Sequence, residues 1–263
     1  MKIGFVGCGK MAKAIIQGIL EKGIVKAENI TAADKLEEVV NAAKNKFGIQ
    51  ATTSNIEAVA GADVIVLAVK PQFLEDVITE IRDSVNNQLI ISIAAGKTMA
   101  WLDEHFGKEV KLVRCMPNVA ALVGEAMTSV SCNSLVTEEE KKTACELIGS
   151  FGRYEMITEN LMDAVIAVSG SSPAYVFMFI EAMADAAVAE GMPRDKAYQF
   201  AAQSVLGSAK MVLETGKHPG ELKDMVCSPA GTTIAAVKVL EEKGFRSAVM
   251  EAMGACAEKN RSL

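Results

Sequence analysis

The segment GCGKMA, residues 7–12, has the glycine pattern of a turn that binds the pyrophosphate of a dinucleotide. It follows a short apolar run, residues 2–6, and opens a helical pattern, as a turn between a strand and a helix must. Gly7 permits the tight turn, Gly9 lets the backbone approach a pyrophosphate, and Ala12 allows close helix–strand packing. The helix N-terminus offers N–H donors to the phosphates. The pattern predicts dinucleotide binding; the alternative is a purely structural turn.

The residues after the second predicted strand bear on the choice between NAD and NADP. Asp34 lies about 20 residues past the glycine pattern, near the spacing of an acid that binds the ribose hydroxyls, and favours NAD. Lys35 beside it suits a 2′-phosphate and favours NADP. A solvated charge pair at the start of a helix is the third interpretation. The residues alone therefore leave the cofactor open.

Lys70 ends another apolar strand pattern, at the carboxyl edge where open α/β sheets bind ligands. It is a candidate to face a phosphate or the nicotinamide. The alternative is a surface lysine before a helix that begins at Pro71.

A second candidate site lies near the C-terminal end, where Ser228 and Pro229 predict a helix N-cap and first turn. The amides of a helix start can hold a carboxylate, and Thr232 and Thr233 add hydroxyl donors from the same turn. Taken alone, the segment is equally well explained as an ordinary capped helix.

Nucleophilic and metal chemistry have little support in the sequence. The two histidines, His105 and His218, occur in no Ser/His or Cys/His arrangement, and the six cysteines are scattered without a C-x-x-C pair. Glu181 and Asp185 share a helix face and are better explained as a solvated or interface-facing pair than as a metal or acid–base site. We therefore predict no metal. Because arrangements for nucleophilic catalysis are lacking, chemistry carried out by a bound cofactor is the better explanation.

The elements that must position these residues alternate between strands and helices. Near-continuous apolar runs such as VIVLAV, residues 64–69, are typical of parallel strands buried on both faces. An added edge strand at 126–132 and a helix at 138–150, with Thr137 as its N-cap, follow. The pattern indicates a Rossmann-type α/β domain, with strands at 2–6, 29–32, 63–69, 88–93 and 111–115 and helices at 10–22, 35–47 and 71–83.

Strand patterns nearly vanish beyond residue 160. We predict a Rossmann domain at 1–159 and an all-α domain at 160–263, with helical stretches at 161–168, 173–191, 195–215, 219–226 and 231–243. The uncharged run 164–180 is broken by polar residues and Pro173, so we expect a loop entering a buried helix rather than a membrane span. The stretch 174–192 is apolar almost all round, which predicts burial against a second subunit.

Composition restricts the partners. The 263 residues carry a net charge of −6 without a Lys/Arg cluster, so we expect neither nucleic acid nor a membrane surface as a partner. The N-terminal segment does not have the pattern of a signal peptide, and unpaired thiols fit a reducing compartment. We expect a cytoplasmic protein.

Read together, five segments resemble pyrroline-5-carboxylate reductases. The resemblance spans essentially the whole chain and is carried by IGFVGCGKMA (3–12), DVIVLAVKPQ (63–72), CMPNVAALVGEAM (115–127), VSGSSPAYVFMFIEAMADAAVAEGM (168–192) and, above all, LKDMVCSPAGTTIAAVKVLE (222–241).

The resemblance implies a Rossmann domain joined to a helical dimerisation domain. It also implies reduction of L-1-pyrroline-5-carboxylate to L-proline, the last step of proline biosynthesis, with NADPH or NADH. Dimers of such enzymes often assemble into pentamers of dimers.

The resemblance also implies roles for single residues. Thr233 would be the catalytic hydrogen-bond partner of the ring nitrogen. The substrate would be bound by Glu159, Ser171, Ser228, Gly231, Thr232 and Thr233. The cofactor would be bound by Gly7, Cys8, Gly9, Lys10, Met11, Ala12, Lys35, Asn55, Ala68, Val69, Lys70, Pro71, Ala94 and Ala95.

The chain departs from the pattern of these enzymes at several positions. Glycine is usual where it has Ser172 and Ala230, and Asn-Thr-Pro is usual at residues 118–120, where it has Asn-Val-Ala. Two other functions remain as alternatives: a hydroxyacid dehydrogenase, for which Lys210 or Lys223 would have to assist oxygen chemistry, and a non-enzymatic NADPH sensor.

Overall fold

The computed structural model describes residues 1–261 and divides the chain into two compact units. The first unit comprises residues 1–170 together with the C-terminal residues from 257, and the second comprises residues 171–256. The domain boundary expected after residue 159 stays a prediction.

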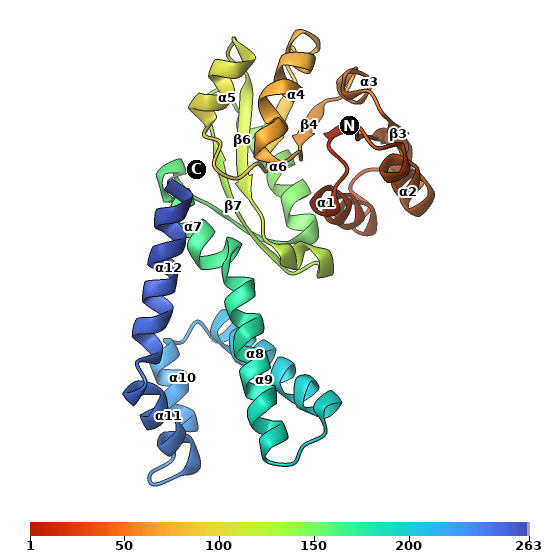
Figure 1. Ribbon diagram of the computed structural model, residues 1–263. Coiled ribbons are helices and arrows are strands. Elements are labelled where there is room, and N and C mark those ends of the chain that lie inside the picture. The colour runs from red at the N-terminus through yellow and green to blue at the C-terminus, as the bar shows by residue number, and fades with distance from the viewer. Residues whose placement is uncertain (262–263) are drawn as a thin grey trace. The chain divides into compact units, whose positions relative to one another are not determined.

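An eight-stranded sheet forms the centre of the first unit (Figure 1). Its strand order is β3-β2-β1-β4-β5-β6-β7-β8, so the order reverses between β1 and β4, where open sheets of this kind bind their ligands. Strands β1 to β6 are parallel, β7 is antiparallel to β6, and β8 is parallel to β7. The strands are β1 (Ile3–Val6), β2 (Ile30–Ala33), β3 (Gln50–Thr52), β4 (Val64–Leu67), β5 (Leu89–Ser92), β6 (Lys111–Met116), β7 (Ala126–Cys132) and β8 (Gly152–Met156).

Helices cover both faces of this sheet. Successive strand residues point to opposite faces, so Phe5 belongs to one apolar core and Val6 to the other. The core around Phe5 is covered by α1 (Lys10–Glu21), α2 (Glu37–Phe47) and α6 (Glu138–Ile148). The core around Val6 is covered by α3 (Asn55–Val59), α4 (Leu74–Ile81) and α5 (Met99–Phe106).

The Rossmann-type architecture predicted from the sequence is confirmed, and the details correct it at the sheet edge. Strand β7 has the predicted bounds but is not an edge strand, because β8 pairs on its outer side. Strand β8 was not predicted, because most of its side chains are exposed and give no apolar alternation. Strand β3, which has only three residues, was not predicted either.

The start of α6 shows how local sequence sets a helix boundary. Thr137 accepts a hydrogen bond from the N–H of Glu140, and the Glu140 carboxylate accepts one from the N–H of Thr137. This reciprocal capping box satisfies two N–H groups that a helix start would otherwise leave unpaired, and it confirms the predicted N-cap.

The segment before the second unit is helical, as predicted for residues 161–168, and it stays helical up to Gly170, where a loop was expected. Residues Glu159–Leu161 form a 3₁₀ turn, followed by α7 (Met162–Val165) and a π-helical turn at Ile166–Gly170. Pro173 does not break the helix, because it lies in the first turn of α8 (Ser172–Ala189), where no intrahelical N–H is needed. By length and composition alone, the helical run Glu159–Ala189 would suffice to cross a membrane.

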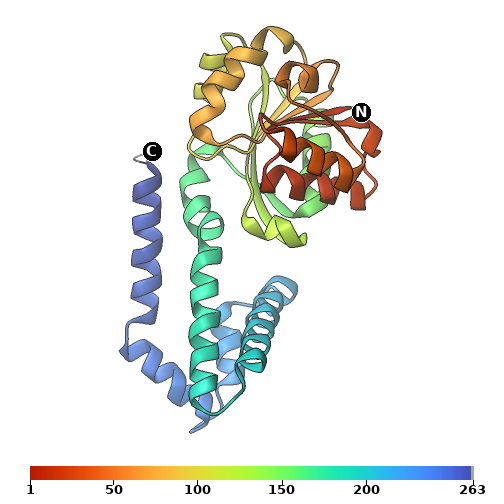
Figure 2. The ribbon, with the colours of Figure 1, turned by 45° about the vertical axis from the view of Figure 1, so that its right-hand side comes forward.

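The second unit is all helical, with α8 and α9 (Arg194–Thr215) packed side by side (Figure 2). Helices α10 (Pro219–Val226), α11 (Thr232–Glu242) and α12 (Phe245–Arg261) follow; the last of these was not among the predicted stretches. Of the described residues in this unit, only the small side chains of Ala184, Ala197 and Ala201 form a buried apolar cluster.

Many large apolar side chains of the second unit are exposed in the single chain. They occur on all five helices and include Phe177, Met178, Phe200, Leu206, Leu213, Met225, Val226, Val239 and Met250. The predicted burial of residues 174–192 is therefore not achieved within one chain, and these helices need a covering surface from outside it.

Candidate active site

The glycine turn after β1 is pressed against the residues that follow β4. Gly7 has a φ of +95°, and a Cβ placed on it would lie 2.8 Å from the carbonyl carbon of Ala68. A side chain at this position would therefore clash as well as strain the backbone. Gly9 differs, because a Cβ placed on it would meet no atom of the described residues within 4 Å. The turn thus packs tightly on one side and opens at Gly9.

The open side of the turn is the N-terminus of α1. Gly9 is the N-cap, and within the described residues no side chain accepts a hydrogen bond at this cap. The first turn carries no acidic residue, and its first residue is the exposed Lys10. The helix start therefore offers backbone N–H groups, the positive end of the helix dipole and a lysine side chain, next to a glycine that leaves space. These features favour binding of the phosphates of a dinucleotide.

Asp34 braces the same turn from the end of β2. Its Oδ2 accepts a hydrogen bond from the backbone N–H of Cys8 at 3.0 Å, and its Oδ1 accepts one from the N–H of Leu36 at 3.2 Å. The acid that the spacing singled out for ribose therefore bonds to two backbone groups of this chain. Lys35 next to it is exposed.

Cys8 itself contributes backbone rather than a reactive thiol. Its side chain is fully buried, and burial raises the pKa of the thiol, with a smaller opposite effect from Lys13. A neutral thiol in an apolar setting is a poor nucleophile.

The other predicted cofactor residues follow parallel strands, at the edge of the sheet where the glycine turn lies. Asn55 opens α3 after β3 and is buried, and its side-chain amide donates to Glu80 Oε2 at 2.8 Å. Lys70 is exposed and precedes a 3₁₀ turn that begins at Pro71, before α4. The remaining residues are Ala68 and Val69 after β4 and Ala94 and Ala95 after β5. That these residues bind the cofactor stays a prediction.

Glu159 makes two hydrogen bonds through one carboxylate oxygen. Its Oε1 accepts from Arg114 Nη1 at 2.7 Å and from the backbone N–H of Met99 at 2.8 Å. Both partners belong to the first unit, as Glu159 does. Arg114 was not among the predicted site residues; a cationic side chain inside the apolar strand pattern 111–115 was the available signal.

The predicted substrate residues near the C-terminal end lie on one turn and helix start. The N–H of Gly231 donates to the carbonyl oxygen of Ser228 at 3.1 Å and closes the turn, and α11 begins at Thr232. The predicted helix start at Ser228 was wrong, because Ala230 has a φ of +57°, which is incompatible with a helix. Gly231 is the N-cap instead, without a side-chain hydrogen bond in the described structure, and Thr233 is the second helical residue.

Ser171 is bonded to Cys256 of α12 within the second unit. Its hydroxyl accepts a hydrogen bond from Cys256 Sγ at 3.2 Å. A hydrogen bond with the same cysteine and burial raise the pKa of Tyr175, against a lowering by Ser171. That Ser171 and the turn of residues 228–233 bind one substrate stays a prediction.

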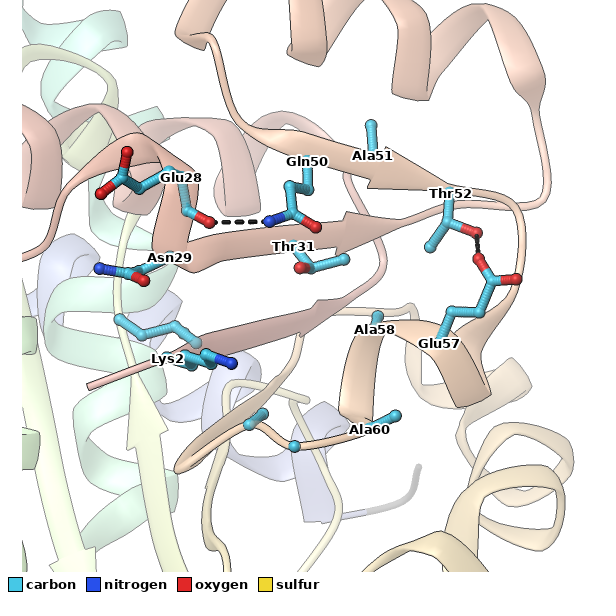
Figure 3. A pocket seen from close by; sticks show the side chains of 13 residues that line it. Lys2, Glu28, Asn29, Thr31, Gln50, Ala51, Thr52, Glu57, Ala58 and Ala60 are labelled. Carbon is cyan, nitrogen blue, oxygen red and sulfur yellow. Dashed lines mark hydrogen bonds between the residues drawn. The ribbon is translucent and has the colours of Figure 1, made fainter.

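A polar cavity of about 240 Å³ lies away from these residues, over strands β2 and β3 (Figure 3). It is bordered by Lys2, by Gln50, whose amide donates to the carbonyl of Glu28 at 2.8 Å, and by Thr52, which bonds to Glu57. Its lining includes Lys2 and Glu28, which precede β1 and β2 at the amino ends of these strands. It is not at the edge where the glycine turn lies.

Comparisons with known proteins extend over the full chain. Residues 159–263 match a family model described as pyrroline-5-carboxylate reductase dimerisation, and residues 2–96 match one described as NADP oxidoreductase, coenzyme F420-dependent. The pyrroline-5-carboxylate reductase of Escherichia coli (strain K12) is 54% identical over 263 residues, which cover 100% of this chain and 98% of that protein.

Solved structures give the same result. A pyrroline-5-carboxylate reductase from Coxiella burnetii superposes with a TM-score of 0.93 at 33% identity, covering 99% of this chain and 97% of the other. The enzyme from Plasmodium falciparum, solved with NADP bound, superposes with a TM-score of 0.90 at 34% identity, covering 100% and 97%.

Proposed function

Because the chain belongs to the pyrroline-5-carboxylate reductase family, we propose that it reduces L-1-pyrroline-5-carboxylate to L-proline with NADPH, and with NADH as a second donor. The observation that carries this is the uncapped start of α1 beside the open position at Gly9, in a chain that matches these reductases over its full length. The function is that of an NAD(P)H-dependent oxidoreductase acting on a C=N bond, in proline biosynthesis.

The cofactor is held by backbone and charge at the carboxyl edge of the sheet. The amides of residues 9–12 bind the pyrophosphate, and Lys10 adds a positive charge near it. Lys35 is exposed and binds the 2′-phosphate, while Asp34 keeps the turn in shape. Asn55, Ala68, Val69, Lys70, Pro71, Ala94 and Ala95 form the rest of this site.

The substrate carboxylate is bound by the N–H groups at the start of α11, together with the Ser228 hydroxyl. This helix start supports the assignment, because its first turn has no acidic side chain and its N-cap, Gly231, has no side chain that could occupy the amides. Ser171 and Glu159 are the other substrate-binding residues proposed from the family resemblance.

Positioning of the substrate against the cofactor supplies most of the catalysis, since a protonated cyclic imine is already electrophilic. When bound, NADPH supplies the hydride that the imine carbon accepts. The Thr233 hydroxyl forms a hydrogen bond with the ring nitrogen and orients the C=N bond. The nitrogen keeps its proton and becomes the amine of proline, so no strong acid is needed in the site.

The test is an assay of the purified protein with pyrroline-5-carboxylate and NADPH or NADH, followed by absorbance at 340 nm and by detection of proline. We expect proline to form in proportion to the cofactor oxidised. Oxidation of hydroxy acids with no proline formed would instead favour a hydroxyacid dehydrogenase. Tight NADPH binding by folded protein without turnover of any imine would favour a sensor.

The second unit forms a homodimer, which assembles further into a pentamer of dimers in a cytoplasmic enzyme. The uncovered apolar side chains of α8 and α9 support the dimer, since a second copy of the same helices would bury them. Light scattering in solution tests the assembly. We expect Met178→Glu, at a side chain that is 68% exposed, to dissociate it, and Lys44→Glu in the first unit to leave it intact.

A further inference from the structure

Arg114 is a charged residue inside the sheet of the first unit. It lies in β6 with only 6% of its surface exposed, paired with Ser92 of β5 and with Ser131 of β7. A guanidinium in such a place needs a partner, because its desolvation is otherwise uncompensated. Glu159, whose side chain is 27% exposed, supplies it at 2.7 Å.

The same carboxylate oxygen also holds the start of α5. It accepts the N–H of Met99, the first residue of that helix, at 2.8 Å. The N-cap residue Thr98 accepts a hydrogen bond from the N–H of Trp101 at 3.1 Å. The first turn of α5 is thus fixed by one neighbouring residue and by one residue 60 positions later in the chain.

A short connection from β5 to α5 lies between two anchored points. At its beginning, the Ser92 hydroxyl accepts from the N–H of Ala94 at 3.4 Å, and at its end Met99 is held by Glu159. Gly96, between them, has a φ of +73° and gives the connection a sharp bend. Ala94 and Ala95, both proposed cofactor residues, belong to this connection.

We propose that Glu159 and Arg114 are a positioning pair, which fixes the connection between β5 and α5 in the shape that the nicotinamide cofactor requires. This inference rests on the proposed cofactor site and assigns Glu159 a role through Met99, in addition to the substrate contact proposed above. A carboxylate that receives two donors on one oxygen, one of them a buried guanidinium, is a rigid support for a backbone segment.

The surroundings allow this pair to be changed without a collapse of the fold. Glu159 and Arg114 line a cavity of about 470 Å³ together with Gly96, Thr98, Asn160, Asp163, Asn260 and Arg261. Solvent can therefore enter when the Glu159 carboxylate is removed. Asp163 provides a matched control, because it lines the same cavity and bonds to Asn260 at 2.8 Å but not to the start of α5.

The experiment measures NADPH affinity in the absence of substrate, by titration of cofactor fluorescence, and the KM values for both substrates in turnover. We expect Glu159→Ala to weaken NADPH binding about tenfold and to raise the KM for NADPH by a similar factor. Glu159→Gln, which keeps a side-chain oxygen to accept from Met99, should weaken it about threefold. Asp163→Asn should stay within twofold of the wild type.

Two further readouts separate positioning from stability and from substrate contact. Ile81→Val, a core change in α4, should lower the midpoint of thermal unfolding while leaving NADPH affinity unchanged. A Glu159→Ala enzyme with unchanged NADPH affinity, whether or not the KM for pyrroline-5-carboxylate rises, would overturn the proposal. Absence of proline formation by the wild type would refute the proposed function instead, and the cofactor titration would still test the pair.

Discussion

The Asp34 carboxylate accepts the backbone N–H of Cys8 at 3.0 Å and so ties the end of β2 to the glycine turn after β1. With Leu36 bonded to the other carboxylate oxygen, Asp34 is a support of the turn. Its neighbour Lys35 is exposed and free of this task. The two adjacent residues therefore differ in their contacts: Asp34 is bonded to the turn, whereas Lys35 is exposed beside it.

We expect Asp34→Ala to raise the KM for NADPH and for NADH by a similar factor, about tenfold, because both cofactors use the glycine turn. Asp34→Asn should be milder, since the amide oxygen still accepts from Cys8. Steady-state kinetics with both cofactors measure this. A loss confined to NADH would mean that Asp34 binds the ribose hydroxyls directly.

Lys35→Ala should raise the KM for NADPH about tenfold and leave the KM for NADH nearly unchanged, because only NADPH carries the 2′-phosphate. The ratio of kcat/KM for the two cofactors measures the effect, and it should weaken as salt rises. Lys44→Ala, at an exposed lysine farther along α2, serves as the control and should leave the ratio unaltered. Equal losses with both cofactors would assign Lys35 to some other contact.

Thr233→Val keeps the shape of the side chain and removes its hydroxyl, so we expect kcat to fall 10-fold to 100-fold while NADPH affinity is kept. Thr233→Ser retains the hydroxyl and should lose less than tenfold. Single-turnover kinetics at saturating cofactor check the step itself. If Thr233→Val turns over like the wild type, the ring nitrogen has another partner.

Ala230 is the one non-glycine residue with a positive φ in the described part of the chain. Ala230→Gly should therefore stabilise the protein by up to about 1 kcal/mol, the left-handed penalty of alanine being partly offset by the greater freedom of glycine in the unfolded chain. Thermal unfolding at fixed protein concentration measures it. Ala42→Gly, on the exposed face of α2, should destabilise by about 1 kcal/mol and gives the opposite sign.

Because of Glu140, the free energy of unfolding of the first unit should decrease as the pH falls into the acid range. Burial acts to raise its pKa, but hydrogen bonds from Lys111, at 2.6 Å, and from Thr137 outweigh this and lower the pKa below its usual value of 4.5. A folded-state pKa below the unfolded one gives stabilisation that is complete above the unfolded value and is lost as pH falls through the folded value.

We therefore expect Glu140→Gln to be less stable than the wild type by roughly 1–2 kcal/mol at pH 7, with the gap closing below pH 4.5. Urea unfolding at a series of pH values measures the gap. Glu138→Gln, at an exposed carboxylate in the same first turn, should show a smaller one. A gap independent of pH would show that the charge of Glu140 is not what stabilises the helix start.

Sequence patterns predicted the parts of the fold that depend on local apolar content. Strand β4 was recognisable because VIVL is apolar at every position, as burial on both faces requires. Strand β8 was not, since Arg153, Tyr154, Glu155 and Met156 are exposed and their place depends on pairing with β7. The helix start at Ser228 was misplaced because Ser-Pro is a common cap and first-turn pair; the signal against it was the glycine usual at position 230 in the enzymes that the chain resembles.

The candidate site divides in the same way. The glycine turn could be predicted because its residues are consecutive in the sequence. Each of its small residues is required by the steric demands of the turn, so the pattern is visible without a structure. The bonds from Asp34 to Cys8 and from Glu159 to Arg114 join residues 26 and 45 positions apart, and only the order of the strands brings them together. Long-range polar pairs of this kind have no periodicity to reveal them.

The second unit, whose buried apolar cluster consists of three alanines, has a thermodynamic consequence. Even with the partly buried side chains that pack on these alanines, among them Ile180, Met183 and Val188, the apolar area buried is small against the conformational entropy of five ordered helices. We therefore expect its folded state to gain free energy from association, and by mass action that gain depends on the protein concentration. For this half of the molecule we therefore expect folding and assembly to be coupled in one equilibrium, so that dilution destabilises it as a denaturant would.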